Sequence, residues 1–268
     1  STHVVLGMDY NGLFKLDFEN LRIASVLGRI GLAWSIAAVL YLNFGVKTRA
    51  AIAVAVLAGY GALSALVAAP DAAGAGPLTF EGNLAGYIDR QFLPGKLIYG
   101  SFDPEGLLST VPAVVTAMLG MFTGEFVRRG DIRGGRKTLW MAAAAAALLA
   151  AGLAFSGVLP VNKKLWSSTF VCVVGAYSLG MFALFYYLID VRGWRRWTLF
   201  FRVVGLNSIT IYLAQRIVGF GRISDFFLGG IASKCPEAVA AGISSAGYVA
   251  VCWLFLYFLY RKNVFLKV

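Results

Sequence analysis

Two long uncharged runs stand next to one another in the sequence: TLWMAAAAAALLAAGLAFSGVL at residues 138–159 and LWSSTFVCVVGAYSLGMFALFYYLI at residues 165–189, separated by PVNKK. A helix needs about 20 mostly apolar residues to cross the ~30 Å hydrocarbon core of a bilayer. Each run is long enough, and its apolar residues extend all round a helix, as lipid and neighbouring helices require. The pair therefore predicts two membrane-spanning helices joined by a tight turn.

The same criterion of length and apolar composition predicts five further spans, at residues 24–44, 50–69, 106–124, 197–215 and 238–260. The stretch 226–233 is too short to span, and no helix pair broken by Pro or Gly stands out. The chain is 59% hydrophobic and 14% charged, with a mean hydropathy of +0.74, whereas soluble domains carry about 25% charged residues. We predict an all-α fold: a polytopic transmembrane helix bundle of about seven spans, forming a single domain over residues 1–268.

Charge in the connections predicts the orientation, because short cytoplasmic loops retain Lys and Arg. A strong basic excess falls on the connections at residues 45–49, 128–137, 190–196 and 261–268. The alternate connections are close to neutral: an extracytoplasmic lead-in at 1–23, a long extracytoplasmic loop at 70–105, the turn at 160–164 and the segment 216–237. We expect the N terminus outside, the C terminus inside, and the second half of the long loop packed across the outer mouth. The net charge of +11 then requires no nucleic acid partner.

The sequence lacks the residues that several kinds of functional site require. The single histidine, His3, and the separated Cys172, Cys235 and Cys252 do not supply a zinc site or a disulfide framework, so we predict no metal. Nucleotide-loop and serine-hydrolase motifs are missing as well. Ser1 is not an initiator Met and no signal peptide follows it, so we expect the chain to be part of a longer protein.

Two carboxylates precede the third span in the sequence DPEG, at Asp103 and Glu105. Asp103 as N-cap followed by Pro104 is a favourable helix start. Carboxylates at the mouth of a membrane helix can also act as acid, base or amine-binding groups. The structural role at a helix start and the functional role are compatible with one another.

The outer turn Asn162-Lys163-Lys164 allows two interpretations. A Lys pair beside Trp166 at a membrane interface usually anchors the protein by snorkelling to the headgroups. These lysines lie on the side where positive charge is disfavoured, so the alternative is a site for an anionic substrate group.

The sixth span is the most polar, with Asn207, Ser208, Thr210 and Gln215. Such side chains either connect helices by hydrogen bonds or line a substrate site. Arg29, about one turn inside the first span, is expected to face a cavity because intramembrane charge is costly unless it is paired or functional.

Other charges favour structural roles. We expect Arg202 to snorkel from a span end, and Glu125 to pair with Arg128 and Arg129 at i+3 and i+4.

Seven segments in order resemble one family: LRIASVLGRIGLAW (21–34), GNLAGYIDR (82–90), FDPEGLLSTVPAVVTAMLG (102–120), LPVNKKLWSSTFV (159–171), IDVRGW (189–194), GLNSITIYL (205–213) and YRKNVFLKV (260–268). The family is that of the heparan-alpha-glucosaminide N-acetyltransferase-like membrane proteins. The resemblance covers nearly the whole chain, from residue 21 onward. Each piece is weak alone, and the set gains its specificity from order and spacing.

The resemblance implies an acyltransferase that uses acetyl-CoA on one side of a membrane to acetylate an amino sugar on the other. It implies that further N-terminal spans and the histidine assigned to acetyl transfer precede the matched region, so that no catalytic histidine carries over to His3. The chain by itself is then either the larger part of an active site or an inactive fragment of the enzyme. The matched positions Asp103, Glu105, Asn162 to Lys164 and Asn207 become candidates for the cavity wall.

The roles we assign follow from charge and position. Asp103 or Glu105 would orient the amine, Asn207 would donate to the thioester carbonyl, and Lys163 with Lys164 would bind anionic groups. Arg29 would neutralise a phosphate or pair with a carboxylate. Gln215 enters as a substrate-binding candidate on its polar face alone.

Two other functions remain open from the residues alone. A small-molecule transporter would also use seven spans with a polar sixth, and a structural membrane protein needs no substrate. We expect a lipid bilayer as surroundings, the cytoplasmic membrane of a bacterium as location, a small molecule or glycan as acceptor, and a homo-oligomer as one compatible state.

Overall fold

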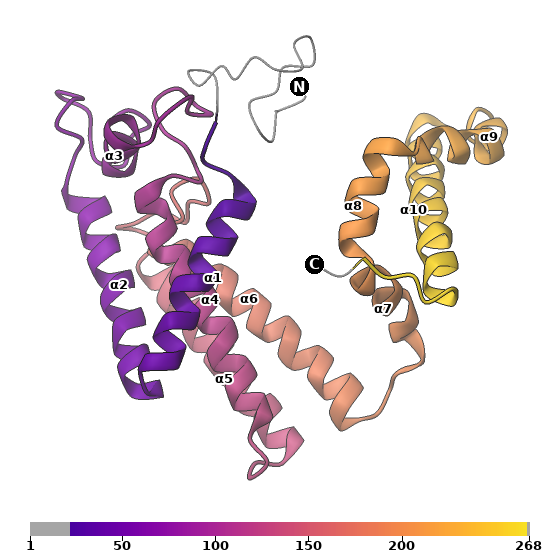
Figure 1. Cartoon of the computed structure of the whole chain (residues 1–268), viewed down its shortest axis with the longest axis horizontal. Coiled ribbons are helices and arrows are strands. Elements are labelled where there is room, and N and C mark those ends of the chain that lie inside the picture. Colours follow the sequence, from indigo (N-terminus) through magenta and orange to yellow (C-terminus); the bar gives the residue numbers. More distant parts are fainter. Residues whose placement is uncertain (1–21, 267–268) are drawn as a thin grey trace. The chain divides into compact units, whose positions relative to one another are not determined.

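The computed structural model describes residues 22–266, and the expected lead-in before residue 22 lies outside them, as does His3. Over the described residues the protein is helical and contains no strand beyond two isolated bridges. The chain divides into two compact units, one ending at Val191 and the other beginning at Arg192 (Figure 1).

The described part of unit 1 contains α1 (Val26–Asn43), α2 (Val46–Leu66), α3 (Leu84–Phe92), α4 (Leu107–Arg128), α5 (Gly134–Ala154) and α6 (Ser168–Tyr186), which continues as the π-helical turn η1 (Tyr187–Val191). The central helix is α4, which contacts all the other helices of the unit, and α5 packs along α6. The long loop between α2 and α4 holds α3.

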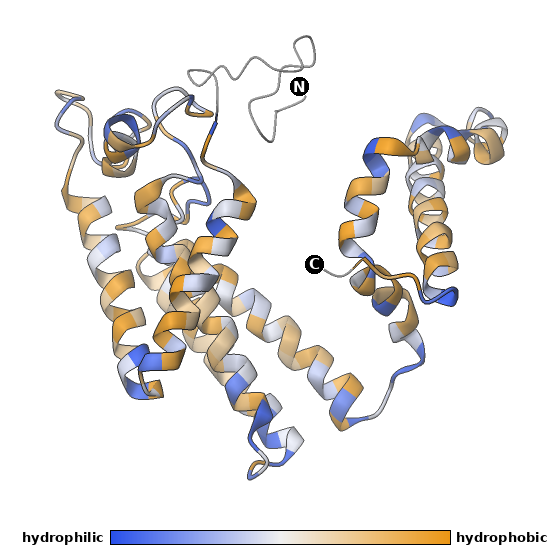
Figure 2. Ribbon diagram, viewed as in Figure 1, coloured by the Kyte–Doolittle hydropathy of each residue, from blue (hydrophilic) through white to orange (hydrophobic). Residues whose placement is uncertain are grey.

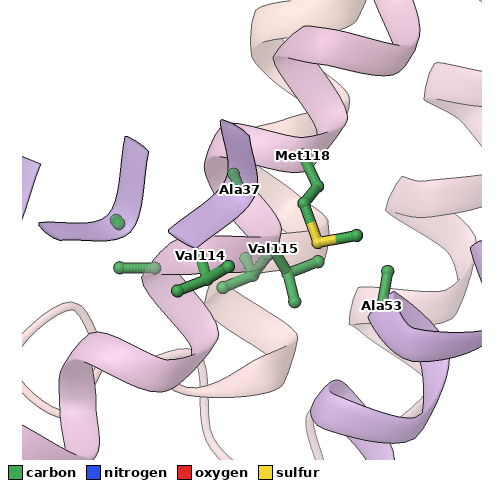
Figure 3. Packing of buried hydrophobic residues seen from close by; sticks show 8 residues of the cluster. Ala37, Ala53, Val114, Val115 and Met118 are labelled. Atoms are coloured by element: carbon green, nitrogen blue, oxygen red, sulfur yellow. The ribbon is translucent and has the colours of Figure 1, made fainter. Parts of the chain in front are cut away.

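Small side chains bring the helices of unit 1 together. Ala37 from α1 and Ala53 from α2 lie against Val115 and Met118 of α4 in the buried cluster of Figure 3. Lipid tails are as apolar as the helices, so association in a membrane depends on close packing, which small residues permit. The alanines at these positions therefore set the spacing of α1 and α2 around α4.

The helix ends of unit 1 gather at two opposite sides of the unit. At the first, which we call the loop end, Arg22 meets the loop after α2, and Tyr60 donates to the carbonyl of Leu165. At the second, the basic end, the α1–α2 turn lies near the C-terminus of α4, through Arg49 and Glu125. Figure 2 shows apolar residues along the helices and hydrophilic residues in the α4–α5 turn at the basic end.

Six helices of the described chain are long and apolar enough to cross a membrane, or seven if the bent pair in unit 2 is one span. Large apolar side chains face outward on them, with Leu27, Leu42 and Leu66 each 75–80% exposed. Such surfaces suit lipid and not water. The predicted multi-span helical fold is confirmed.

Unit 2 contains a short 3-10 turn, η2 (Arg196–Thr198), followed by α7 (Leu199–Leu206), α8 (Ser208–Ile217), α9 (Phe220–Ala232) and α10 (Glu237–Arg261). The long helix α10 contacts α7 and α9, and Ala214, Phe220 and Cys252 form a small buried cluster. The stretch 226–233, predicted as a short isolated piece, belongs to the 13-residue α9.

The predicted continuous span 197–215 is wrong in one respect. It bends by 61° between α7 and α8, and the residue at the break is an Asn, not the Pro or Gly considered in the sequence analysis. The break falls on Asn207, whose backbone (φ −127°, ψ 27°) leaves the helical region. Asn disfavours helix interiors because its side chain competes for backbone hydrogen bonds.

Candidate functional site

Four charged side chains meet at the loop end of unit 1. Arg22 donates to both carboxylate oxygens of Asp103, at 2.8 and 2.7 Å, and its Nη2 also bonds Oε2 of Glu105. Arg29 approaches Oε1 of Glu105 to 3.6 Å. The two predicted carboxylates are thus brought together with two guanidinium groups in a charge-balanced cluster, which we call the arginine–carboxylate cluster.

Arg29, which was expected to face a cavity, is buried in the structure. Its Nη1 donates to the carbonyl of Pro104 at 2.7 Å, and its guanidinium lies 4.0 Å from the ring centroid of Trp166. The indole Nε1 of Trp166 donates in turn to Thr116 Oγ1 on α4. Of the two partners expected for Arg29, phosphate or carboxylate, the structure supplies a carboxylate, that of Glu105.

The carboxylate that caps α4 is Asp89, which sequence analysis missed. Asp89 lies on α3, is 0% exposed, and accepts hydrogen bonds from the backbone N–H of Leu107 (2.9 Å) and of Asp103 (3.2 Å). The expected N-cap role of Asp103 is therefore wrong, because α4 begins at Leu107 and its N-cap position is Gly106. A Cβ on Gly106 would overlap the Asp89 carboxylate, which explains glycine there.

The pKa values of Asp103 and Asp89 are shifted in opposite directions. Burial disfavours charge on Asp103, but hydrogen bonds from Arg22 and from the backbone of Glu105 and Ile98 outweigh it and hold its pKa below the usual range. Burial raises the pKa of Asp89 to about 6, against the hydrogen bonds from the two backbone N–H groups. Asp103 is therefore a permanent anion near neutral pH and a poor general base.

The turn at Asn162 to Lys164 separates its residues by role. Asn162 Oδ1 accepts from the backbone N–H of Lys164 at 2.8 Å, and the backbone N–H of Asn162 donates to Ser167 Oγ at 3.0 Å. Asn162 thus shapes the turn. Both lysines are exposed at the loop end, and Nζ of Lys164 lies 4.5 Å from the ring centroid of Tyr99.

The polar residues of the sixth predicted span lie in unit 2. Asn207 is 1% exposed and its Oδ1 accepts from Thr210 Oγ1 at 3.3 Å. Ser208 and Gln215 are exposed on α8. The arginine–carboxylate cluster, in contrast, belongs to unit 1.

The basic end has a different ion pair from the predicted one. Glu125 bonds Arg49 across helices, at 2.9 and 3.1 Å, and not Arg128 or Arg129. The partner of Arg129 is Asp131. Arg49 is 4% exposed, so a carboxylate beside it compensates a buried charge, which a surface i+4 pair cannot do.

One side chain of the cluster, Arg22, and the neighbour of Arg29, Trp166, carried weak sequence signals. Arg22 precedes the first span and reads as part of the lead-in, and Trp166 reads as an interfacial anchor. Trp166 adopts φ 52°, which is rare for a bulky residue and often marks a constrained site. Within residues 22–266, no group of three or more His, Cys, Asp or Glu is placed to hold a metal.

The membrane-length helices and the charged cluster at one end of unit 1 define the class: a polytopic helical membrane protein with a polar site at a helix mouth. No family model matches the chain. It is 28% identical over 209 residues to the heparan-alpha-glucosaminide N-acetyltransferase of Homo sapiens, and 27% identical over 205 residues to that of Mus musculus. Each alignment covers 70% of this chain and 30% of the relative. The chain is thus a distant relative of these N-acetyltransferases and matches less than a third of their length.

Proposed function

We propose that the chain forms part of a membrane acyltransferase that transfers an acetyl group from acetyl-CoA to an amino sugar or similar amine across a membrane. The observation that carries the proposal is the relationship to two N-acetyltransferases over 70% of the chain. The arginine–carboxylate cluster fits this chemistry because an amine acceptor arrives as an ammonium ion and needs a carboxylate to orient it.

Glu105 is the carboxylate best placed to meet the acceptor. All the polar capacity of Asp103 is engaged by Arg22 and by backbone N–H groups, and its side chain is 0% exposed. The Glu105 side chain is 12% exposed, and Arg29 reaches its Oε1 at 3.6 Å, beyond hydrogen-bond distance. Oε1 of Glu105 therefore retains lone pairs for an ammonium ion, while Asp103 positions Arg22 and through it Glu105.

Lys163 and Lys164 extend the proposed site. Their ammonium groups are exposed at the same end of unit 1 as Glu105, where they would attract an acceptor that carries carboxylate, sulfate or phosphate. In this proposal the loop end faces outward, the basic end faces the cytoplasm of a bacterium, and the acceptor enters from outside.

The test begins with calorimetry on the purified protein in detergent, titrated with acetyl-CoA, CoA and ATP. We expect binding of acetyl-CoA and no binding of ATP. Transfer of labelled acetyl to glucosamine is then compared between the wild type and two variants, with the N-terminal spans and histidine that the resemblance implies supplied together with this chain. Glu105→Gln should lower transfer roughly 100-fold because the amine loses its orienting charge, whereas Glu81→Gln, an exposed glutamate of the same loop, should leave transfer unchanged.

A folded protein that binds no acetyl-CoA would contradict the acyltransferase proposal. Full transfer by the Glu105→Gln variant would leave the proposal standing and remove Glu105 from the site.

The break between α7 and α8 favours one second candidate, a small-molecule transporter. Discontinuous helices line substrate paths in transporters, and the bend here is 61°. Solute uptake by reconstituted vesicles without an acyl donor would support transport, and donor-dependent acetylation without uptake would exclude it.

A further inference from the structure

At the α7–α8 break, both backbone polar groups of Asn207 are hydrogen-bonded. The N–H of Asn207 donates to the carbonyl of Val204 at 3.1 Å, and the carbonyl of Asn207 accepts from the N–H of Ile211 at 3.0 Å. The first N–H groups of a helix have no acceptor within it, and the 61° bend turns α8 away from the axis of α7. The N–H groups at residues 208–210 therefore have no acceptor within α8 itself, and no side chain of the N-cap residue accepts from them.

The side chain at the break adds another donor. An Asn at the N-cap usually accepts a hydrogen bond from the first turn, but Asn207 makes no side-chain cap bond to the described backbone. Its Oδ1 is used by the Thr210 hydroxyl at 3.3 Å, and its Nδ2 is buried without a partner among residues 22–266. A buried donor left unpaired is destabilising, because it has lost its hydrogen bonds to water without replacement. The start of α8 thus combines backbone donors without a side-chain cap and, among the described residues, an unpaired amide.

Such an arrangement fits an oxygen with negative charge. The N-terminus of a helix carries a partial positive charge, and its N–H groups bind anions and developing oxyanions. Preorganised amide donors in a place with little water are what acyl transfer requires at the carbonyl oxygen. We propose that the α7–α8 break is an oxyanion site, in which Asn207 Nδ2 and the first N–H groups of α8 donate to the acyl oxygen of the thioester.

This inference rests on the proposed acyl transfer. The acceptor amine forms a C–N bond to the thioester carbon while the carbonyl π electrons move to oxygen, and the site stabilises that oxyanion. When the carbonyl forms again, the C–S bond breaks and CoA leaves with the sulfur electrons. The proton lost by the amine ends on the thiol, so the products are the amide and CoA.

The experiment compares wild type with Asn207→Ala and with a matched control, Ser224→Ala. Ser224 on α9 is also 1% exposed with an unpartnered side-chain oxygen, but it lies inside a helix and not at a helix start. The infrared band of [1-¹³C]acetyl-CoA should shift to lower frequency on binding to wild type and to Ser224→Ala, and should shift less with Asn207→Ala. Acetyl transfer by Asn207→Ala should fall roughly 100-fold, while affinity for CoA, which lacks the acyl oxygen, stays unchanged.

An unchanged carbonyl band and full transfer in Asn207→Ala would overturn the oxyanion site and leave the proposed function intact. If wild type neither binds acetyl-CoA nor transfers acetyl, both proposals fall together. Asn207→Asp covers the case of an unstable alanine variant. A carboxylate over the start of α8 should raise the thermal midpoint by capping the helix and abolish transfer by repelling the oxyanion, so a more stable and fully active variant would also overturn the site.

Discussion

At the scale of the residue, Asp89 carries a charge whose cost depends on pH. Its carboxylate is buried and joins α3 to the start of α4 through two backbone N–H groups. The pKa is raised to about 6 in the fold, against an ordinary value of about 3.9. The folded state therefore holds a proton that the unfolded state has already lost between these values. The contribution of Asp89 to stability is full below about pH 4 and is lost as the pH rises through about 6.

We predict that Asp89→Asn removes this pH dependence. Thermal unfolding in detergent between pH 4.5 and 7 should show a wild-type contribution that weakens with rising pH, and a flatter profile for the variant, because the amide does not ionise. Asp71→Asn is the control, since the pKa of Asp71 is lowered by Arg90 and its own effect falls at lower pH. A variant that keeps the wild-type slope would contradict the assignment to Asp89.

The same residue shows where sequence reasoning stops at this scale. The pattern DPEG predicted that a helix starts at Asp103. The helix α4 does start close by, at Leu107. The capping carboxylate comes instead from Asp89, because α3 docks onto the start of α4. Nothing in a linear motif encodes that docking. Asp103 is thereby released to bind Arg22, a partner 81 residues away in sequence.

At the scale of the element, one ion pair connects α2 to α4 at the basic end. Arg49 is 4% exposed and lies between the rings of Tyr41 and Phe122, with its guanidinium 4.5 and 5.5 Å from their centroids. Glu125 supplies the compensating charge. Removal of one partner from a buried pair leaves an uncompensated charge, which costs far more than the loss of a surface pair.

We predict that Glu125→Ala destabilises the protein by about 1–2 kcal/mol, less than the loss of a fully buried pair because Glu125 is partly exposed. The measurement is the thermal or denaturant midpoint in detergent. Asp131→Ala provides the control, because Asp131 and Arg129 are both more than half exposed and their pair should contribute little. Equal midpoints for the two variants would show that Arg49 is hydrated in the protein and needs no carboxylate.

Elements were predictable where composition alone decides them. Long apolar runs gave the spans at α1, α2, α4, α5, α6 and α10, because bilayer thickness sets their length. The break between α7 and α8 was not predicted, since hydropathy averages Asn207 and the other polar residues of this span with their many apolar neighbours. The helix α3 was not predicted for a different reason. Its nine residues are too few and too polar to meet the criterion for a membrane span.

At the scale of the whole molecule, the described chain has six or seven candidate spans, and an odd number places its two ends on opposite sides of a membrane. The loop end of unit 1 holds Asp89, Asp103 and Glu105, each engaged in hydrogen bonds or ion pairs. The basic end holds the segment 128–137 with its five basic residues. Positive charge is retained on the cytoplasmic side, which is the physical reason to expect the loop end outside.

This orientation makes a prediction for each unit separately. Single cysteines in a cysteine-free background, at Lys163 and Arg136 in unit 1 and at Lys234 and Lys262 in unit 2, all replace exposed residues. A membrane-impermeant maleimide applied to intact cells should label positions 163 and 234, and should label 136 and 262 only after permeabilisation. The inverse pattern would place the arginine–carboxylate cluster on the cytoplasmic side, where its partner would be the acyl donor and not the amine acceptor. Labelling of 234 and 262 from the same side would instead mean that α10 does not cross the bilayer, and the seven-span count would fall with it.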